Sequence, residues 1–358
     1  MSNYFLDRDA KNIERQKEIV SQLPRFVNEF FIGISLKTSA LTRLNYAYDL
    51  RIFFDYLARV TLKKDVLSIG LKDLEAIDAF DIELFLDYLS NYVFNGKQIR
   101  AAAAGKERKL STIRSFFKYY FKKDKIDKNV ATKVDMPKTN DKGIVKLEPN
   151  EVANLLDKID SDNINGLSNK QKRFHDKLKI RDSAIVTLFL GTGIRISELV
   201  GLNVEDIHFE SNSFSVTRKG GDKSLLYFSD EIGSALKRYL NDLKREIEEE
   251  TSLGLKLIEY GYDKKYALFV SLLGTRITVR TVEYMVKKYS SLVTVKKITP
   301  HKLRSTFGTE LYKNTQDIYV VADVLGHKDV NTTKKHYAAI SDEIRKNAAR
   351  TVRLRDED

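Results

Sequence analysis

Two arginines stand in contexts that suggest a place for an anionic group. Arg195 lies among apolar neighbours in the segment GTGIRISELVGL, and Glu198 follows it by three residues, on the same face if this segment is helical. Arg304 follows His301 by the same interval, and His301 comes directly after Pro300, which can begin a helix. A guanidinium binds anionic oxygens through paired hydrogen bonds, and an imidazole exchanges protons near neutral pH. Such an arginine is either a surface residue or a partly buried one with an anionic partner.

Three further residues are informative because of their order along the chain. Lys219 stands in the turn TRKGGDK, either as a solvated turn residue or as a lysine that a hairpin carries into a groove. His327 follows a glycine that marks a helix end, and Tyr337 lies in the basic stretch beyond it. Most of the 18 tyrosines must be packing residues, so Tyr337 matters only as the last member of the series Arg, Lys, His-x-x-Arg, Gly-His, Tyr.

The composition narrows the class of partner. The 358 residues include 62 Lys and Arg against 50 Asp and Glu, a net charge of +12 at pH 7. This balance favours a polyanion, nucleic acid first and an anionic membrane surface second. Cysteine is absent, which excludes a disulfide scaffold, a thiol nucleophile and a cysteine-ligated metal site. The five histidines are too scattered to predict a metal site, and we expect neither a metal nor a cofactor.

The sequence also indicates where the protein acts. No stretch approaches the roughly 18 consecutive apolar residues of a membrane span. The first residues lack the basic and then apolar layout of a secretory signal. We therefore expect a soluble cytoplasmic protein with no membrane partner.

The length and the 42% of hydrophobic residues predict about two domains. Apolar residues at helical spacing predict helices over residues 41–60, 79–92 and 107–123 in the first part of the chain. Residues 131–150 contain two prolines and a glycine and are typical of an interdomain linker.

The helix at 107–123 has two chemically different faces on a helical wheel. One face is apolar and carries Leu110, Ile113, Phe117, Tyr120 and Phe121. The other is polar and carries Ser111, Thr112, Ser115, Lys118 and Lys122. Residues 97–133 hold twelve basic and three acidic side chains, a net charge of +9. The polar face is either a solvated surface or one that binds DNA.

The second part of the chain mixes helices and strands. Helices are predicted at 148–159, 182–190, 231–250 and after Pro300, and strands at 207–217 and 224–228. The polar segment 161–181 is expected to be an insertion or loop with a helical piece. The expected fold class is mainly α with a small β-sheet, α+β.

Taken together, these segments resemble the tyrosine recombinases of the phage-integrase type, and within them the Xer group. Five segments are similar to that family's motifs and occur in the family's order: LSTIRSFFKYY, GTGIRISELVGL, VTRKGG, TPHKLRSTFGTELY and LGHKDVNTTKKHY. The overall length, the long leader and the insertion at 161–181 are most similar to the single-recombinase subgroup. Ser305 departs from the pattern, since many relatives have a second histidine there.

The resemblance implies a role for each residue of the series. Tyr337 would be the nucleophile, Arg195 and Arg304 the phosphate clamp, Lys219 the general acid, His301 the proton acceptor, His327 a hydrogen-bond donor to the phosphate and Glu198 a supporting residue. The implied reaction is cutting and rejoining of DNA through a 3′-phosphotyrosyl link, with no cofactor and no metal.

The resemblance also implies an architecture. A helical SAM-like core-binding domain (residues 16–130), a linker (131–147) and a catalytic domain (148–350) would form a C-shaped clamp on double-stranded DNA. Recombination of two sites implies a homotetramer, and an FtsK-type DNA translocase is a candidate partner.

The expected task is resolution of chromosome dimers at a dif-like site during cell division. The alternatives are an integrase or excisionase of a mobile element with the same chemistry, a catalytically silent DNA-binding regulator, and a type IB topoisomerase.

Overall fold

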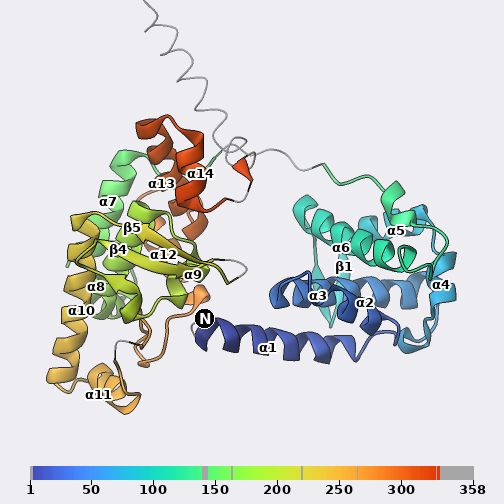
Figure 1. Cartoon of the computed structure of the whole chain (residues 1–358), viewed down its shortest axis with the longest axis horizontal. Coiled ribbons are helices and arrows are strands. Elements are labelled where there is room, and N and C mark those ends of the chain that lie inside the picture. The colour runs from blue at the N-terminus through green and yellow to red at the C-terminus, as the bar shows by residue number, and fades with distance from the viewer. Residues whose placement is uncertain are drawn as a thin grey trace, which may run out of the picture. The chain divides into compact units, whose positions relative to one another are not determined.

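The structure is a computed structural model of the chain and describes residues 3–138, 144–162, 164–218, 221–263, 265–327 and 329–330 (Figure 1). The chain divides into two compact units, Met1–Asp141 and Lys142–Asp358. Both are mainly helical and each contains a small antiparallel sheet, which confirms the predicted fold class. No helix in these ranges is long and apolar enough to cross a membrane.

The first unit is a helical bundle with one hairpin. Its elements are α1 (Asn3–Val20), α2 (Val27–Ile34), α3 (Ala40–Tyr56), the π-helical turn η1 (Leu57–Thr61), the 3-10 turn η2 (Val66–Ser68), α4 (Leu71–Ala76), α5 (Ala79–Tyr88), β1 (Tyr92–Phe94), β2 (Lys97–Ile99), α6 (Ala103–Phe121) and the 3-10 turn η3 (Val130–Lys133). Polar caps define where helices begin. The Ser39 hydroxyl accepts the Thr42 amide at the start of α3, and Asp78 and Asp81 form a reciprocal capping box at α5.

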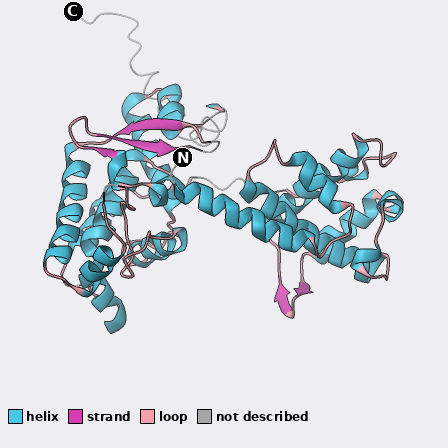
Figure 2. Ribbon diagram, turned by 60° about the horizontal axis from the view of Figure 1, so that its bottom comes forward, coloured by secondary structure: helices cyan, strands magenta, loops and turns pink. Residues whose placement is uncertain are grey.

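The β1–β2 hairpin corrects the expectation of one helix over residues 79–92. Helix α5 ends at Tyr88, and the two short strands project from the helices of this unit (Figure 2). Asn95 and Gly96 both have positive φ, 49° and 72°, as a type I′ turn requires. The Asn-Gly pair was the available signal, and the helical spacing that precedes it concealed the change of structure.

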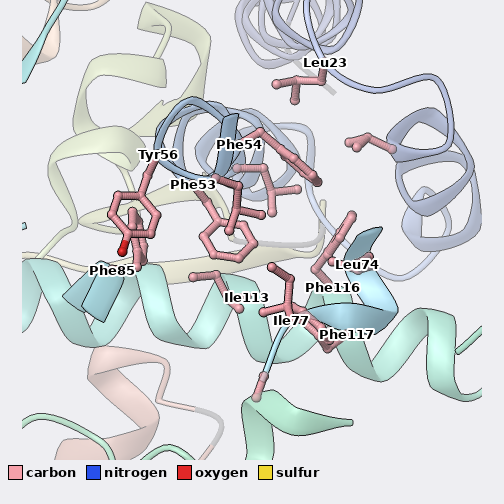
Figure 3. Close-up of a cluster of buried hydrophobic side chains, with 14 of the residues drawn as sticks. Leu23, Phe53, Phe54, Tyr56, Leu74, Ile77, Phe85, Ile113, Phe116 and Phe117 are labelled. Carbon is pink, nitrogen blue, oxygen red and sulfur yellow. The ribbon is translucent and has the colours of Figure 1, made fainter. Parts of the chain in front are cut away.

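Aromatic rings fill the core of the first unit (Figure 3). Phe53 of α3 meets Phe85 of α5 edge to face, with ring centroids 5.1 Å apart. Phe54 meets Phe116 of α6 in the same way at 5.7 Å. All four rings are fully buried, so aromatic packing holds α3, α5 and α6 together.

The second unit surrounds a long central helix. Its elements are α7 (Pro149–Asp160), α8 (Asn169–Thr192), α9 (Ile196–Gly201), the 3-10 turn η4 (Val204–Asp206), β3 (Ile207–His208), β4 (Ser213–Thr217), β5 (Lys223–Tyr227), α10 (Asp230–Glu248), α11 (Ser252–Glu259), α12 (Val279–Ser290), α13 (Pro300–Thr315) and α14 (Ile318–Leu325). Helices α7, α10 and α13 all pack against α8. The sheet order is β3-β4-β5, with all neighbours antiparallel.

Two expectations for this unit were wrong in extent. The predicted strand at 207–217 is two strands, because the chain reverses at Asn212 with φ at 46°. Helix α8 begins at Asn169 rather than at residue 182, so the helical piece expected within the insertion is the first part of this longer helix. A Ser168–Gln171 capping box starts it, and buried His175 lies 2.9 Å from the Tyr289 hydroxyl of α12.

Candidate active site

Arg304 joins two helix ends. It lies in the second turn of α13, only 4% exposed, and its guanidinium donates to the carbonyls of Gly193 and Leu325. Gly193 ends α8 and Gly326 ends α14, each with φ of +60°. Carbonyls at helix C-termini lack intrahelical donors and carry partial negative charge, so a cation is stabilised between them. The two left-handed glycines therefore give Arg304 its anchor points.

Arg195 reaches the same place from α9. Its guanidinium donates to the Gly326 carbonyl at 2.8 Å and to Glu198 Oε1 at 2.9 Å. Its backbone amide donates to the other Glu198 oxygen at 3.0 Å, which closes a capping box at the start of α9. Glu198 is buried and thus fixes both the backbone and the side chain of Arg195. The structure brings Arg195 and Arg304 onto consecutive carbonyls of one turn.

The two histidines lie around Arg304. His327 Nε2 is 3.3 Å from Nη2 of Arg304, and the His327 amide donates to the Ala322 carbonyl, which continues the end of α14 into this turn. His301 is exposed in the first turn of α13, three residues before Arg304 and so on the same helix face. The expected Lys219 and Tyr337 lie outside the described residues.

Arg218 is a neighbour of this site that the sequence reasoning missed. Its guanidinium donates to Glu198 Oε1 at 3.4 Å, to the Leu325 carbonyl at 3.4 Å and to the Val324 carbonyl at 3.3 Å. The signal was period-two alternation along β4, since Phe214 and Val216 are buried and Arg218 is next in that series. Within TRKGGDK the family resemblance points to Lys219 alone, so Arg218 received no role.

Helix α6 presents most of the expected polar residues, with one correction. Ser111, Lys118 and Lys122 are exposed and Ser115 is half-buried. Thr112 is fully buried, and its hydroxyl donates to Asp49 Oδ2 of α3 at 3.0 Å, so it was wrongly assigned to the polar face. Phe121 is 45% exposed and not part of the apolar face.

Three of the basic residues of α6 bind other groups of the first unit. Arg108 and Lys109 form ion pairs with buried Asp49, and Arg114 donates to the carbonyls of Ala131 and Val134. Burial raises the pKa of Asp49, while Arg108 and Lys109 oppose that rise. The charge available on the surface of α6 is thus smaller than the sequence count indicates.

In the described part of the chain no group of three or more His, Asp or Glu side chains is arranged to hold a metal ion. Among the described residues, three guanidiniums donate hydrogen bonds to the Leu325–Gly326 turn, and the Glu198 carboxylate accepts from two of them. These four groups sum to +2. The arrangement suits an anionic ligand with several oxygens.

Comparisons with known proteins place the chain in a family. The model of the phage integrase family matches residues 146–343. Tyrosine recombinase XerS of Streptococcus thermophilus strain CNRZ 1066 is 30% identical over 359 residues, covering 94% of this chain and 97% of that protein. Tyrosine recombinase XerC of Caldanaerobacter subterraneus subsp. tengcongensis is 32% identical over 302 residues, covering 81% and 75%.

Solved structures agree on the fold. XerH recombinase bound to palindromic difH substrate, a post-cleavage complex, has a TM-score of 0.61 at 20% identity and covers 87% of this chain and 80% of that one. Tn1549 transposon integrase in complex with transposon right end DNA also has a TM-score of 0.61, at 19% identity, covering 90% and 98%. The chain belongs to the phage integrase family and is a site-specific tyrosine recombinase, as its motifs predicted.

Proposed function

We propose that this recombinase cuts and rejoins duplex DNA through a 3′-phosphotyrosyl intermediate on Tyr337 and resolves chromosome dimers at a dif-like site. The observation that carries the proposal is the meeting of Arg195 and Arg304 at the Leu325–Gly326 turn. Two guanidiniums fixed at one turn can bind both non-bridging oxygens of a single phosphate, where charge develops during transfer.

The chemistry balances without an external energy source. The Tyr337 oxygen forms a bond to phosphorus as the bond from phosphorus to the 5′ oxygen breaks. The phenol proton passes to His301, and Lys219 protonates the departing 5′ oxygen. One ester replaces another, so the reverse attack by a 5′-hydroxyl rejoins the strand. A phenol with an ordinary pKa of about 10 is both a usable nucleophile and a usable leaving group.

The remaining site residues serve the phosphate or its clamp. His327, beside Arg304, donates a hydrogen bond to the scissile phosphate. Glu198 orients Arg195 through two hydrogen bonds and acts as a supporting residue rather than a proton carrier. Since the clamp is made of guanidiniums, this step needs no metal ion and no cofactor.

DNA contact by the first unit is proposed for the exposed side of α6. We assign this DNA contact to Ser111, Ser115, Lys118 and Lys122. Thr112 is not included because its side chain is buried. Residues 16–130 would form the core-binding domain, 131–147 the linker and 148–350 the catalytic domain. The solved relatives bound to DNA substrates support duplex DNA as the partner.

The cellular assignment rests on the extent of the match to XerS, which covers nearly the whole of both chains. The same proposal includes a homotetramer on DNA, a cytoplasmic location and control by an FtsK-type translocase. The test is to map covalent protein–DNA junctions across the host genome. One chromosomal site is expected, whereas junctions confined to the ends of a mobile element would contradict chromosome dimer resolution and favour an integrase.

A further inference from the structure

We propose that Arg218 is a positioning residue of the recombinase, holding the turn at residues 324–326 in the geometry in which Arg195 and Arg304 bind one phosphate. This inference rests on the proposed function of those two arginines. It concerns a side chain directly after β4, next to the hairpin turn, to which the series Arg, Lys, His-x-x-Arg, Gly-His, Tyr assigns no role.

The contacts define what Arg218 holds. Three consecutive carbonyls at the end of α14 each accept from a guanidinium. Arg218 binds Val324 at 3.3 Å and Leu325 at 3.4 Å. Leu325 also accepts from Arg304, so one carbonyl is common to the clamp and to Arg218. A displacement of Arg218 would therefore reach an anchor point of the clamp directly.

The shape of the turn is matched to Arg218. Gly326 has φ of +60°, and a Cβ placed there would lie 2.7 Å from Cζ and 2.8 Å from Nη1 of Arg218. Real Cβ atoms do not approach other atoms so closely, so any side chain at position 326 would displace the guanidinium. Gly326 thus serves twice, as the left-handed end of α14 and as the space that Arg218 occupies.

Arg218 also touches the partner of Arg195. Glu198 Oε1 accepts from Arg195 at 2.9 Å and from Arg218 at 3.4 Å. The side chains of Arg218 and Glu198 are 11% and 3% exposed, so water screens their interaction weakly. Because Glu198 divides its negative charge between two guanidiniums, it neutralises Arg195 less completely than it would in an exclusive pair. Arg195 is therefore better able to bind an anion.

The experiment separates positioning from two other roles. Arg218→Gln, Arg218→Lys and Gly326→Ala are made in the full-length chain and assayed by single-turnover formation of the covalent adduct on a suicide duplex. Each substrate is used with an ordinary scissile phosphate and with sulfur in place of the 5′ bridging oxygen, because a thiolate leaves without a general acid. DNA affinity and thermal unfolding are measured in parallel.

We expect R218Q and G326A each to slow adduct formation by between about tenfold and about 100-fold, with DNA affinity changed less than about threefold. Adding R218Q to G326A should slow the reaction no further, since G326A already displaces the guanidinium and in addition strains the left-handed end of α14. R218K should recover part of the rate. Arg276→Gln is the matched control, because Arg276 also binds backbone carbonyls, those of Val200 and Leu202, and it should lower stability with little effect on rate.

Three results would overturn the inference. One is an R218Q rate equal to wild type. Another is a defect that disappears with the sulfur substrate, which would assign Arg218 to the placement of Lys219 instead. The third is an equal rate loss in R276Q, which would make the effect one of stability alone. If the wild-type chain forms no adduct, the proposed function itself fails and this inference with it.

Discussion

Arg195 and Arg304 donate hydrogen bonds to adjacent backbone carbonyls, those of Gly326 and Leu325, at the C-terminal end of α14. Neither guanidinium depends on the other for its place, because Glu198 orients the first and the Gly193 carbonyl orients the second. In the proposed function, the phosphate clamp is therefore already assembled by the protein's own contacts. Preorganised donors of this kind need no rearrangement when charge develops in the transition state.

Replacement of either clamp arginine by lysine should slow DNA cleavage by about 10²–10³-fold. Lysine keeps the charge, but it has no planar fork and cannot bridge Gly193 and Leu325 as Arg304 does. Single-turnover adduct formation by Arg304→Lys measures the effect. Arg245→Lys, at an exposed position of α10 where the arginine pairs with Asp242, is the control and should react as wild type. If R304K slowed adduct formation by less than about tenfold, this would contradict the proposal that Arg304 clamps the phosphate.

Neutralising the lysines on α6 should weaken DNA binding and its dependence on salt. Each phosphate contact contributes about 0.9 to the slope of log K against log salt concentration, so Lys118→Gln with Lys122→Gln should lower the slope by about 2. Binding isotherms at several salt concentrations give this value. The pair Lys37→Gln and Lys72→Gln removes the same charge from other exposed positions of the first unit. Equal slopes for the two double variants would show that α6 is only a solvated surface.

Removal of the Asp49 carboxylate should destabilise the first unit by about 3 kcal/mol, because Lys109 would remain buried without its partner. Hydrogen exchange of the α3 and α6 amides in the full chain under denaturant reports this change for Asp49→Ala. Glu29→Gln is the control, since its pair with Lys125 is about 40% exposed on both sides and should contribute at most about 1 kcal/mol. Equal effects of the two substitutions would rule out a special role for the buried cluster.

The pair of Glu151 and Lys296 should make the second unit sensitive to acid. Burial favours the neutral carboxyl, but hydrogen bonds from Lys296, the Glu148 amide and Thr294 outweigh it and lower the pKa of Glu151 from 4.5 to about 2. Because the pKa of Glu151 is lower in the folded than in the unfolded chain, the ionised carboxylate stabilises the fold at every pH above the ordinary pKa of 4.5. This stabilisation is lost as the pH falls from 4.5 towards 2. Thermal midpoints of wild type and Glu151→Gln should differ at pH 6 and converge near pH 2. A difference independent of pH would contradict the shift.

The order of motifs in the sequence predicted the family, and it singled out Arg195 and Arg304, which the structure brings to one turn. Their role as a phosphate clamp is still a prediction. The same reasoning failed where tertiary contacts decide the outcome. A helical wheel assigns Thr112 by angle alone and cannot show that the buried Asp49 of another helix lies against it. The Asn95-Gly96 pair is typical of a hairpin turn, but the helical spacing of the residues before it favoured a helix up to residue 92.

The role of Arg218 was hidden for a related reason. From the sequence it is one of several basic residues beside a glycine-rich turn, and only the end of α14 supplies the carbonyls that it binds. His175 is a similar case, because its partners Ser161 and Tyr289 lie at the start of the insertion and in a distant helix. Residues whose partners are distant in sequence leave no local pattern to read.

The most direct test of the account is to identify the residue that carries DNA after reaction with a suicide substrate. Proteolysis and mass spectrometry of the adduct should locate the nucleotide on Tyr337, and Tyr337→Phe should bind the same duplex and form no adduct. A nucleotide attached to another side chain, or a covalent adduct formed by the Y337F chain, would contradict the central claim.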